Sequence, residues 1–303
     1  MTTRTDDEIR ASVSRAYGAR VRPVLESITL APAPAAAVGG SCCGPECCLP
    51  EGASQTIELI DVTPMATDCN ACCEKSAVAS NGCCGTDAED IDISNIARLY
   101  ASTDISDLPA TVTDVAFGCG NPTAIAALQP GEVVLDLGSG GGIDCFLAAK
   151  MVGETGRVFG VDMTAEMIAL ARKNAGKVGA TNVEFRLGEI EHLPIADASV
   201  DVIISNCVIN LSPDKDQVFR EALRVLRPGG RLQVSDIVWT RPVPEDVKQD
   251  MEKWAGCIAG ALLESEYLGK IESAGFGDVT SVSSEYPGGK GIASASVVAF
   301  KRA

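Results

Sequence analysis

Histidine is almost missing from this chain: among 303 residues there is one, His192. Zinc sites commonly use histidine ligands, and a Ser-His-Asp triad needs a histidine as its base. With a single histidine, in the short sequence EHLP, we expect neither kind of site. We interpret His192 as an exposed polar residue of a loop.

Positive charge is also scarce. Lys and Arg number 25 against 41 Asp and Glu, so the formal net charge is −16. Long-range attraction to phosphate backbones or anionic lipids is therefore unfavourable, and we expect neither nucleic acid nor membrane as a partner. No apolar run is long enough to span a bilayer, and MTTRTDDEIR has acids where a signal peptide is basic and then apolar. We expect a cytoplasmic protein.

Cysteine, by contrast, is abundant, with 13 residues, nine of them between Cys42 and Cys84. In a reducing compartment they indicate thiol, metalloid or redox chemistry rather than a disulfide framework. Residues 1–90 are expected to form an N-terminal region: a helix over 7–22 that Pro23 stops or kinks, an Ala/Pro linker over 31–40, and the irregular Cys-rich part. The paired cysteines leave several roles open: metalloid capture, a zinc or iron–sulfur site, a redox reserve, or a tail without specific binding.

The pattern changes beyond Ile91 to alternating strand-like and helix-like segments, typical of a parallel sheet with helices on both faces. We expect an α/β, Rossmann-like domain over residues 91–303, with its C-terminal part, 241–303, completing the sheet. The expected strands are 133–138, 157–163, 183–189, 200–208 and 230–238, followed by an antiparallel pair at 278–286 and 293–302. The expected helices are 143–152, 164–179, one that begins at Ser212-Pro213, and a region from about 244 to 274.

A glycine-rich loop follows the first of these strands. Residues 136–142, DLGSGGG, fit D-x-G-x-G-x-G, and Asp162 ends the next strand 20 residues after Gly142, where a carboxylate can accept both ribose hydroxyls. Position 143 is Ile, so the last glycine falls one place early for a dinucleotide motif. An acid such as Asp136 ahead of the glycines also suits a cationic sulfonium better than a pyrophosphate. The loop therefore favours S-adenosylmethionine.

These segments resemble the class I methyltransferases over about residues 92–303, with a seven-stranded sheet. The resemblance implies that the loop lines the methionine end of the cofactor, that Asp162 and Met163 contact ribose and adenine, and that Asn206 lies beside the methyl group. The remaining residues implied for the cofactor are Gly138, Ser139, Gly140 and Gly142 of the loop, and Gly188, Glu189 and Ile190 at the adenine edge.

Three cysteines stand far apart in otherwise ordinary methyltransferase sequence: Cys119 in AFGCGNPT, Cys207 in ISNCVINLSPDK and Cys257 in KWAGCIAGAL. Cys207 ends the fourth strand, so it faces the crevice at the carboxyl ends of the sheet. In this order the motifs closely resemble the arsenite S-adenosylmethionine methyltransferases. The resemblance implies that these cysteines bind As(III), that the reaction gives methylated arsenicals, and that it serves arsenic detoxification. Cys145, on the helix after the glycine loop, is expected to pack in the core.

Three thiolates suit a soft trivalent centre and leave its lone pair free to attack the sulfonium methyl group, so a general base is not needed. The family is also thought to reduce the oxidised product with an upstream cysteine and a thiol of the glutathione or thioredoxin type. No cysteine lies between Cys84 and Cys119, so Cys83 and Cys84 are the nearest candidates, and thioredoxin is an expected partner. Two alternatives remain: a methyltransferase of a small organic molecule, and a metalloid-binding buffer or sensor.

Overall fold

The computed structural model describes residues 5–30, 105, 107–113, 127–243, 258, 260–286 and 291–303. Several sequence predictions fall outside these ranges: the linker over 31–40, the cysteines from Cys42 to Cys84, Cys119, Cys257, and the helical region over 244–257. Among the described helices, none is both long and apolar enough to cross a membrane.

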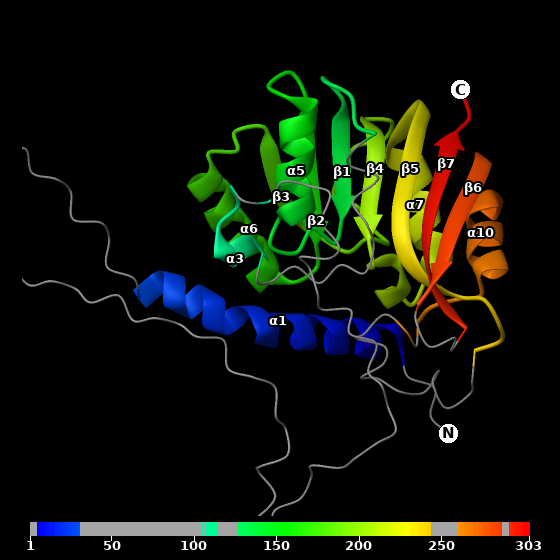
Figure 1. Ribbon diagram of the computed structural model, residues 1–303, viewed down its shortest axis with the longest axis horizontal. Helices are drawn as coiled ribbons and strands as arrows, with labels where there is room; N and C mark the ends of the chain where they lie inside the picture. Colours follow the sequence, from blue (N-terminus) through cyan, green and yellow to red (C-terminus); the bar gives the residue numbers. More distant parts are fainter. Residues whose placement is uncertain are drawn as a thin grey trace, which may run out of the picture. The chain divides into compact units, whose positions relative to one another are not determined.

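A seven-stranded sheet forms the centre of the domain (Figure 1). Its strands are β1 (Val133–Leu137), β2 (Arg157–Asp162), β3 (Val183–Leu187), β4 (Val200–Asn206), β5 (Leu226–Trp239), β6 (Phe276–Glu285) and β7 (Ile292–Lys301). They lie in the order β3-β2-β1-β4-β5-β7-β6, with β1 to β5 parallel and β7 antiparallel to both of its neighbours. The predicted mostly parallel sheet and its closing pair are confirmed. The strand order reverses between β1 and β4, which is where an open α/β sheet has its ligand crevice.

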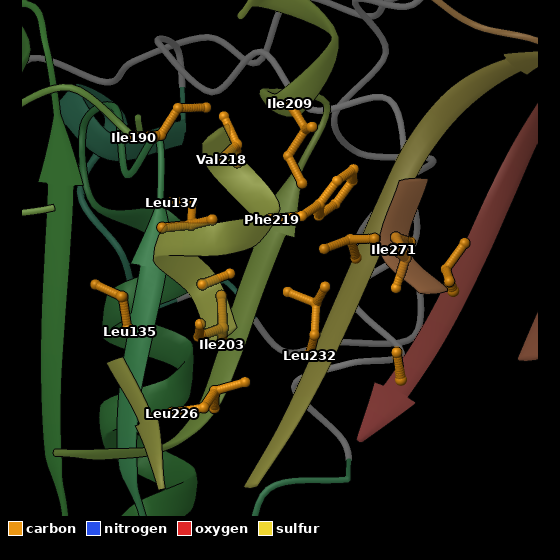
Figure 2. Close-up of a cluster of buried hydrophobic side chains, with 14 of the residues drawn as sticks. Leu135, Leu137, Ile190, Ile203, Ile209, Val218, Phe219, Leu226, Leu232 and Ile271 are labelled. Atoms are coloured by element: carbon orange, nitrogen blue, oxygen red, sulfur yellow. The ribbon is translucent and has the colours of Figure 1, made fainter. Parts of the chain in front are cut away.

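Helices cover both faces of the sheet because successive strand residues point to opposite sides. Leu135 and Leu137 of β1 belong to a buried cluster that also includes Phe219 of α7 (Lys215–Val225) and Ile271 of α10 (Glu264–Ser273), as Figure 2 shows. On the other face, Val134 packs with α5 (Ile143–Val152) and α6 (Ala165–Val178). The shorter helices are α3 (Ala110–Thr113) and the 3₁₀ turn η1 (Ile209–Leu211). The bounds of α5 agree with the predicted ones.

The N-terminal helix α1 (Asp6–Leu30) is longer than predicted, because it continues through Pro23. Val13 and Val21 are buried, and Val21 packs on Met167 and Leu170 of α6. Beyond Pro23, the partly buried Val24 and Leu25 pack against the same cluster. Packing on both sides of the proline therefore stabilises the helix, although the proline removes one backbone hydrogen bond. α1 therefore packs with the methyltransferase domain, in the same compact unit.

The start of α7 also differs from the prediction. Asp214, rather than Ser212, caps the helix, and its Oδ1 accepts from the Gln217 N–H at 2.9 Å. Ser212 instead closes η1 and donates its hydroxyl to Glu191 at 2.7 Å. Both residue types favour N-caps, so composition alone does not separate them.

Candidate active site

The glycine loop connects β1 to α5 and approaches the turn after β4. The N–H groups of Gly138 and Ser139 both donate to the Val161 carbonyl, at 2.7 and 3.0 Å. Gly138 has φ +73°, and a Cβ added there would lie 2.2 Å from Cγ2 of Val208. Only glycine fits this conformation and this space. The loop backbone is thereby held close to the residues that follow Asn206.

Gly142 is required for a different reason. It precedes α5 with φ +98°, and an added Cβ would lie 2.7 Å from a ring atom of Phe146 and 2.9 Å from one of Phe185. These two rings pack edge to face, with centroids 5.7 Å apart. The third glycine of the motif thus allows close packing of helix and sheet.

Asp162 ends β2, and its side chain holds the glycine loop by a hydrogen bond. Its Oδ2 accepts from the Gly140 N–H at 3.0 Å, and its Oδ1 accepts from the Thr164 N–H at 2.8 Å. Burial raises the pKa of this carboxyl, while the hydrogen bonds from Thr164 and Gly140 oppose the rise. A carboxylate oxygen accepts more than one hydrogen bond, so Asp162 retains acceptor capacity for a ligand.

A pocket of about 920 Å³, its open mouth included, lies at the carboxyl ends of the strands beside the glycine loop. Eight residues named from the sequence line it: Gly138, Ser139, Gly140, Asp162, Met163, Ile190, Asn206 and Cys207. The hydroxyl of Ser139 is buried and has no hydrogen-bond partner within the described part of the chain. A buried polar atom of this kind fits a polar group of a bound ligand.

Four other named residues are not among those lining the pocket: Asp136, Gly142, Gly188 and Glu189. Asp136 is buried, and its Oδ2 accepts from the thiol of Cys145 at 3.3 Å. Burial, and then the nearby Asp144, raise the pKa of Asp136 well above its usual range. Cys145 is a free, buried thiol among the core residues on this side of the sheet, as predicted.

Gly188 and Glu189 follow β3. The Gly188 N–H donates to the Asp162 carbonyl at 3.0 Å, which joins this loop to the end of β2. Oε2 of Glu189 lies 3.9 Å from Nδ1 of His192, and the His192 side chain is 72% exposed. His192 is therefore an exposed loop residue, as predicted.

Sequence reasoning did not find the part of the pocket that α1 supplies. Arg10, Val13 and Tyr17 line the pocket together with the loop residues. Figure 1 shows α1 running across the ends of the strands, below the sheet in this view. The amphipathic pattern indicated a helix, but no local signal tells which surface such a helix covers.

Asp144 was also missed. It lies in the first turn of α5 and lines the pocket, and the side-chain amide of Asn206 reaches its Oδ2 at 3.5 Å. Its position directly after the glycine loop, in GID, was the available signal. The carboxylates of Asp144 and Asp162 therefore both line the pocket, together with the paired Arg10 and Glu191, and a cationic ligand is favoured there.

Cys207 lies on the pocket wall next to Asn206 and is 2% exposed. Its φ is +57°, unusual for a residue other than glycine, and its N–H donates to the Ser235 carbonyl at 2.8 Å. Cys207 is disulfide-bonded in the structure. The other two cysteines predicted to bind As(III), Cys119 and Cys257, lie outside the described residues.

The fold of the sheet and its pocket are those of a class I, S-adenosylmethionine-dependent methyltransferase, and residues 128–275 match the family model of a methyltransferase domain. A solved arsenic (III) S-adenosylmethionine methyltransferase from Chlamydomonas reinhardtii is 37% identical, with a TM-score of 0.58, over 65% of this chain and 71% of that one. The chain belongs to the arsenite methyltransferase family.

Two curated relatives carry the same family name. The arsenite methyltransferase of Halobacterium salinarum is 51% identical over 213 residues, which make up 70% of this chain and 54% of the relative. That of Aquipseudomonas alcaligenes is 47% identical over 54% of this chain and 48% of the relative. The chain thus spans about half the length of these curated relatives.

Proposed function

We propose that this chain transfers methyl groups from S-adenosylmethionine to trivalent arsenic bound by the thiolates of Cys119, Cys207 and Cys257. The observation that carries the proposal is the position of Cys207 on the wall of the cofactor pocket, directly after Asn206. Membership of the arsenite methyltransferase family supports the same substrate.

The residues of the pocket fit S-adenosylmethionine. Asp162 offers carboxylate oxygens to ribose hydroxyls, the buried Ser139 hydroxyl lacks a partner among the described residues, and Met163 and Ile190 offer apolar surface to adenine. Asp144 is placed to balance positive charge on the methionine part. When bound, S-adenosylmethionine supplies an electrophilic sulfonium methyl group. We assign Asn206 to the methyl end, and Asp136, Gly142, Gly188 and Glu189 to support of the surrounding loops.

The three thiolates hold arsenic as a soft, pyramidal centre whose lone pair faces the pocket. The lone pair would form the As–C bond as the S–CH₃ bond breaks, which would leave a neutral thioether and formally oxidise arsenic by two electrons. No proton leaves arsenic, so no general base is required. The protein acts through proximity, alignment and exclusion of water.

A thiol reductant completes the cycle. Two electrons return the oxidised arsenic to the trivalent state, and we assign this step to a thiol of the glutathione or thioredoxin type, with Cys83 or Cys84 as the upstream cysteine. The same reductant opens the disulfide of Cys207, because only the thiolate binds arsenic. This need for reduced thiols agrees with a cytoplasmic enzyme. The paired cysteines before Cys84 gather metalloid in this scheme.

The experiment is turnover of the reduced protein with arsenite, S-adenosylmethionine and a thiol, followed by speciation of the arsenicals. We expect cofactor consumption that depends on arsenite, with methylated arsenicals as products. Cofactor consumption that does not depend on arsenite would favour a methyltransferase of an organic substrate. Arsenite binding without turnover would favour a metalloid buffer or sensor. Either result would overturn the proposal.

A further inference from the structure

A buried polar network adjoins the turn that carries Cys207. Asp236, Asn210 and Tyr267 are each at most 1% exposed, and none of them lines the cofactor pocket. Asp236 lies on β5, Asn210 in η1 and Tyr267 on α10. A carboxylate in such a place is costly, and apolar residues of similar size often stabilise a core better. The network therefore suggests a role beyond stability.

Asp236 joins η1 to the sheet. Its Oδ2 accepts from the Asn210 N–H at 3.2 Å and from the Tyr267 hydroxyl at 3.3 Å, and its Oδ1 accepts from the Ile237 N–H at 3.0 Å. The side-chain amide of Asn210 also donates to the Ile237 carbonyl at 2.7 Å. All three groups around the carboxylate are donors, so an acceptor-only side chain suits this position.

The Cys207 turn is thus fixed at both ends to consecutive residues of one strand. The N–H of Cys207 donates to Ser235, and the N–H of Asn210 donates to Asp236. Nζ of Lys215 adds hydrogen bonds to the carbonyls of Asn210 and Ser212, at 3.2 and 2.8 Å. A cysteine at φ +57° is strained and persists only where its surroundings determine it. Glycine would relieve this strain, and its absence indicates that the thiol is needed here.

We propose that Asp236 is a positioning residue that fixes the turn from Cys207 to Asn210 and so holds the Cys207 thiolate at the wall of the cofactor pocket. The inference rests on the proposed function, in which that thiolate binds arsenic. Asp236 acts through the turn, because it does not line the pocket and its side chain accepts from Asn210, Ile237 and Tyr267 among the described residues.

The test compares Asp236→Asn with Tyr267→Phe in the reduced full-length protein. Asp236→Asn keeps the size but replaces one of the two acceptor oxygens by an NH₂ donor. Either the Ile237 N–H, or the Asn210 N–H together with the Tyr267 hydroxyl, then loses its acceptor. Tyr267→Phe is the matched control, since it removes a hydrogen bond from the same Oδ2 without touching the turn. The readouts are kcat and KM for arsenite, the Kd of S-adenosylmethionine, and the rate at which iodoacetamide alkylates Cys207, followed by peptide mass spectrometry.

We expect Asp236→Asn to lower kcat by about 10- to 100-fold, the scale for a misplacement of about 1 Å. The Kd of S-adenosylmethionine stays near the wild-type value, and the alkylation of Cys207 becomes faster. In Tyr267→Phe, the kcat, the Kd of S-adenosylmethionine and the rate of Cys207 alkylation remain close to the wild-type values. If Asp236→Asn does not fold, Asn210→Ala takes its place with the same expectations, because it releases the turn from Ile237 and keeps the carboxylate.

Alkylation requires no arsenite, so it separates the two proposals. A wild type that does not methylate arsenite, with faster alkylation in Asp236→Asn than in Tyr267→Phe, would sink the proposed function and leave the positioning of the thiol supported. If Asp236→Asn, or Asn210→Ala in its place, keeps the wild-type kcat and the wild-type rate of Cys207 alkylation, the positioning role is overturned. Equal effects of Asp236→Asn and Tyr267→Phe would also overturn it, since the network would then be merely structural.

Discussion

Arg10 of α1 donates from Nε to Oε1 of Glu191 across 3.3 Å, although 181 residues separate them in sequence. The Glu191 side chain is only 4% exposed, and the same oxygen accepts from the hydroxyl of Ser212 at 2.7 Å. Glu191 directly follows Ile190, and both line the pocket. This pair therefore fixes the N-terminal helix to the wall of the pocket.

Replacing Arg10 by Met removes the charge and keeps most of the apolar stem. We expect the free energy of unfolding to fall by about 1–3 kcal/mol, because Glu191 loses a charged partner in a buried place. The affinity for S-adenosylmethionine falls too, since α1 is less firmly held over the pocket. Urea unfolding and calorimetry measure the two effects. The control is Arg15→Met at an exposed position of the same helix, and identical behaviour of the two variants would contradict the role of the pair.

Asp162→Ala removes a carboxylate expected to accept the ribose hydroxyls. We expect the binding free energy of S-adenosylmethionine to weaken by about 1.5–3 kcal/mol, the scale of a lost hydrogen bond to a charged group. Arsenite binding persists, because the cysteine site does not include Asp162. Calorimetry measures the binding of both ligands. The cofactor affinity of Asp162→Asn should lie between those of the wild type and Asp162→Ala. An unchanged cofactor affinity in Asp162→Ala would remove this residue from the site.

Gly138→Ala and Gly176→Ala form a matched pair of glycine substitutions. At Gly138 a methyl group meets Val208 in a left-handed backbone, so we expect unfolding to become easier by about 2–4 kcal/mol and cofactor binding to be lost. At Gly176, inside α6, an added Cβ meets nothing within 4 Å, and stability rises by up to about 1 kcal/mol. Thermal unfolding distinguishes the two, and a Gly138→Ala protein as stable as wild type would contradict the close packing.

The glycine loop shows what the sequence was able to predict. Its strand, its glycines, the first helix and Asp162 are encoded by neighbouring residues, so the pocket beside this loop lies where the local pattern indicated a cofactor. The docking of α1 did not follow, since Arg10 and Glu191 meet only through long-range packing. The motif predicts Asp136 as a cofactor residue; its side chain accepts from Cys145, and its role toward the cofactor stays a prediction.

Asp236 makes the free energy of unfolding depend on pH. Burial raises the pKa of this carboxyl from 3.8 to about 7 in the folded protein, although hydrogen bonds and Lys215 oppose the rise. The folded state then binds the proton more tightly than the unfolded state. The stability from this proton is fully present below about pH 4 and is lost as the pH rises through about 7.

We therefore expect the unfolding free energy of Asp236→Asn, relative to wild type, to increase between about pH 4 and about pH 7. An amide carries no charge, so the variant avoids the cost of a buried carboxylate at high pH. Urea unfolding of both proteins over this range measures the difference, in which the other titrating groups cancel. A difference that does not change with pH would show that Asp236 keeps an ordinary pKa.

The three-thiolate site is the central claim, and X-ray absorption at the arsenic edge tests it most directly. Reduced wild-type protein with one equivalent of arsenite should show about three sulfur neighbours around arsenic, since soft thiolates are its preferred ligands. Cys119→Ser, Cys207→Ser and Cys257→Ser should each show about two sulfur neighbours and one oxygen, with methylation reduced by orders of magnitude. Three sulfur neighbours in every variant, with methylation at the wild-type rate, would contradict the site and identify these cysteines as packing residues.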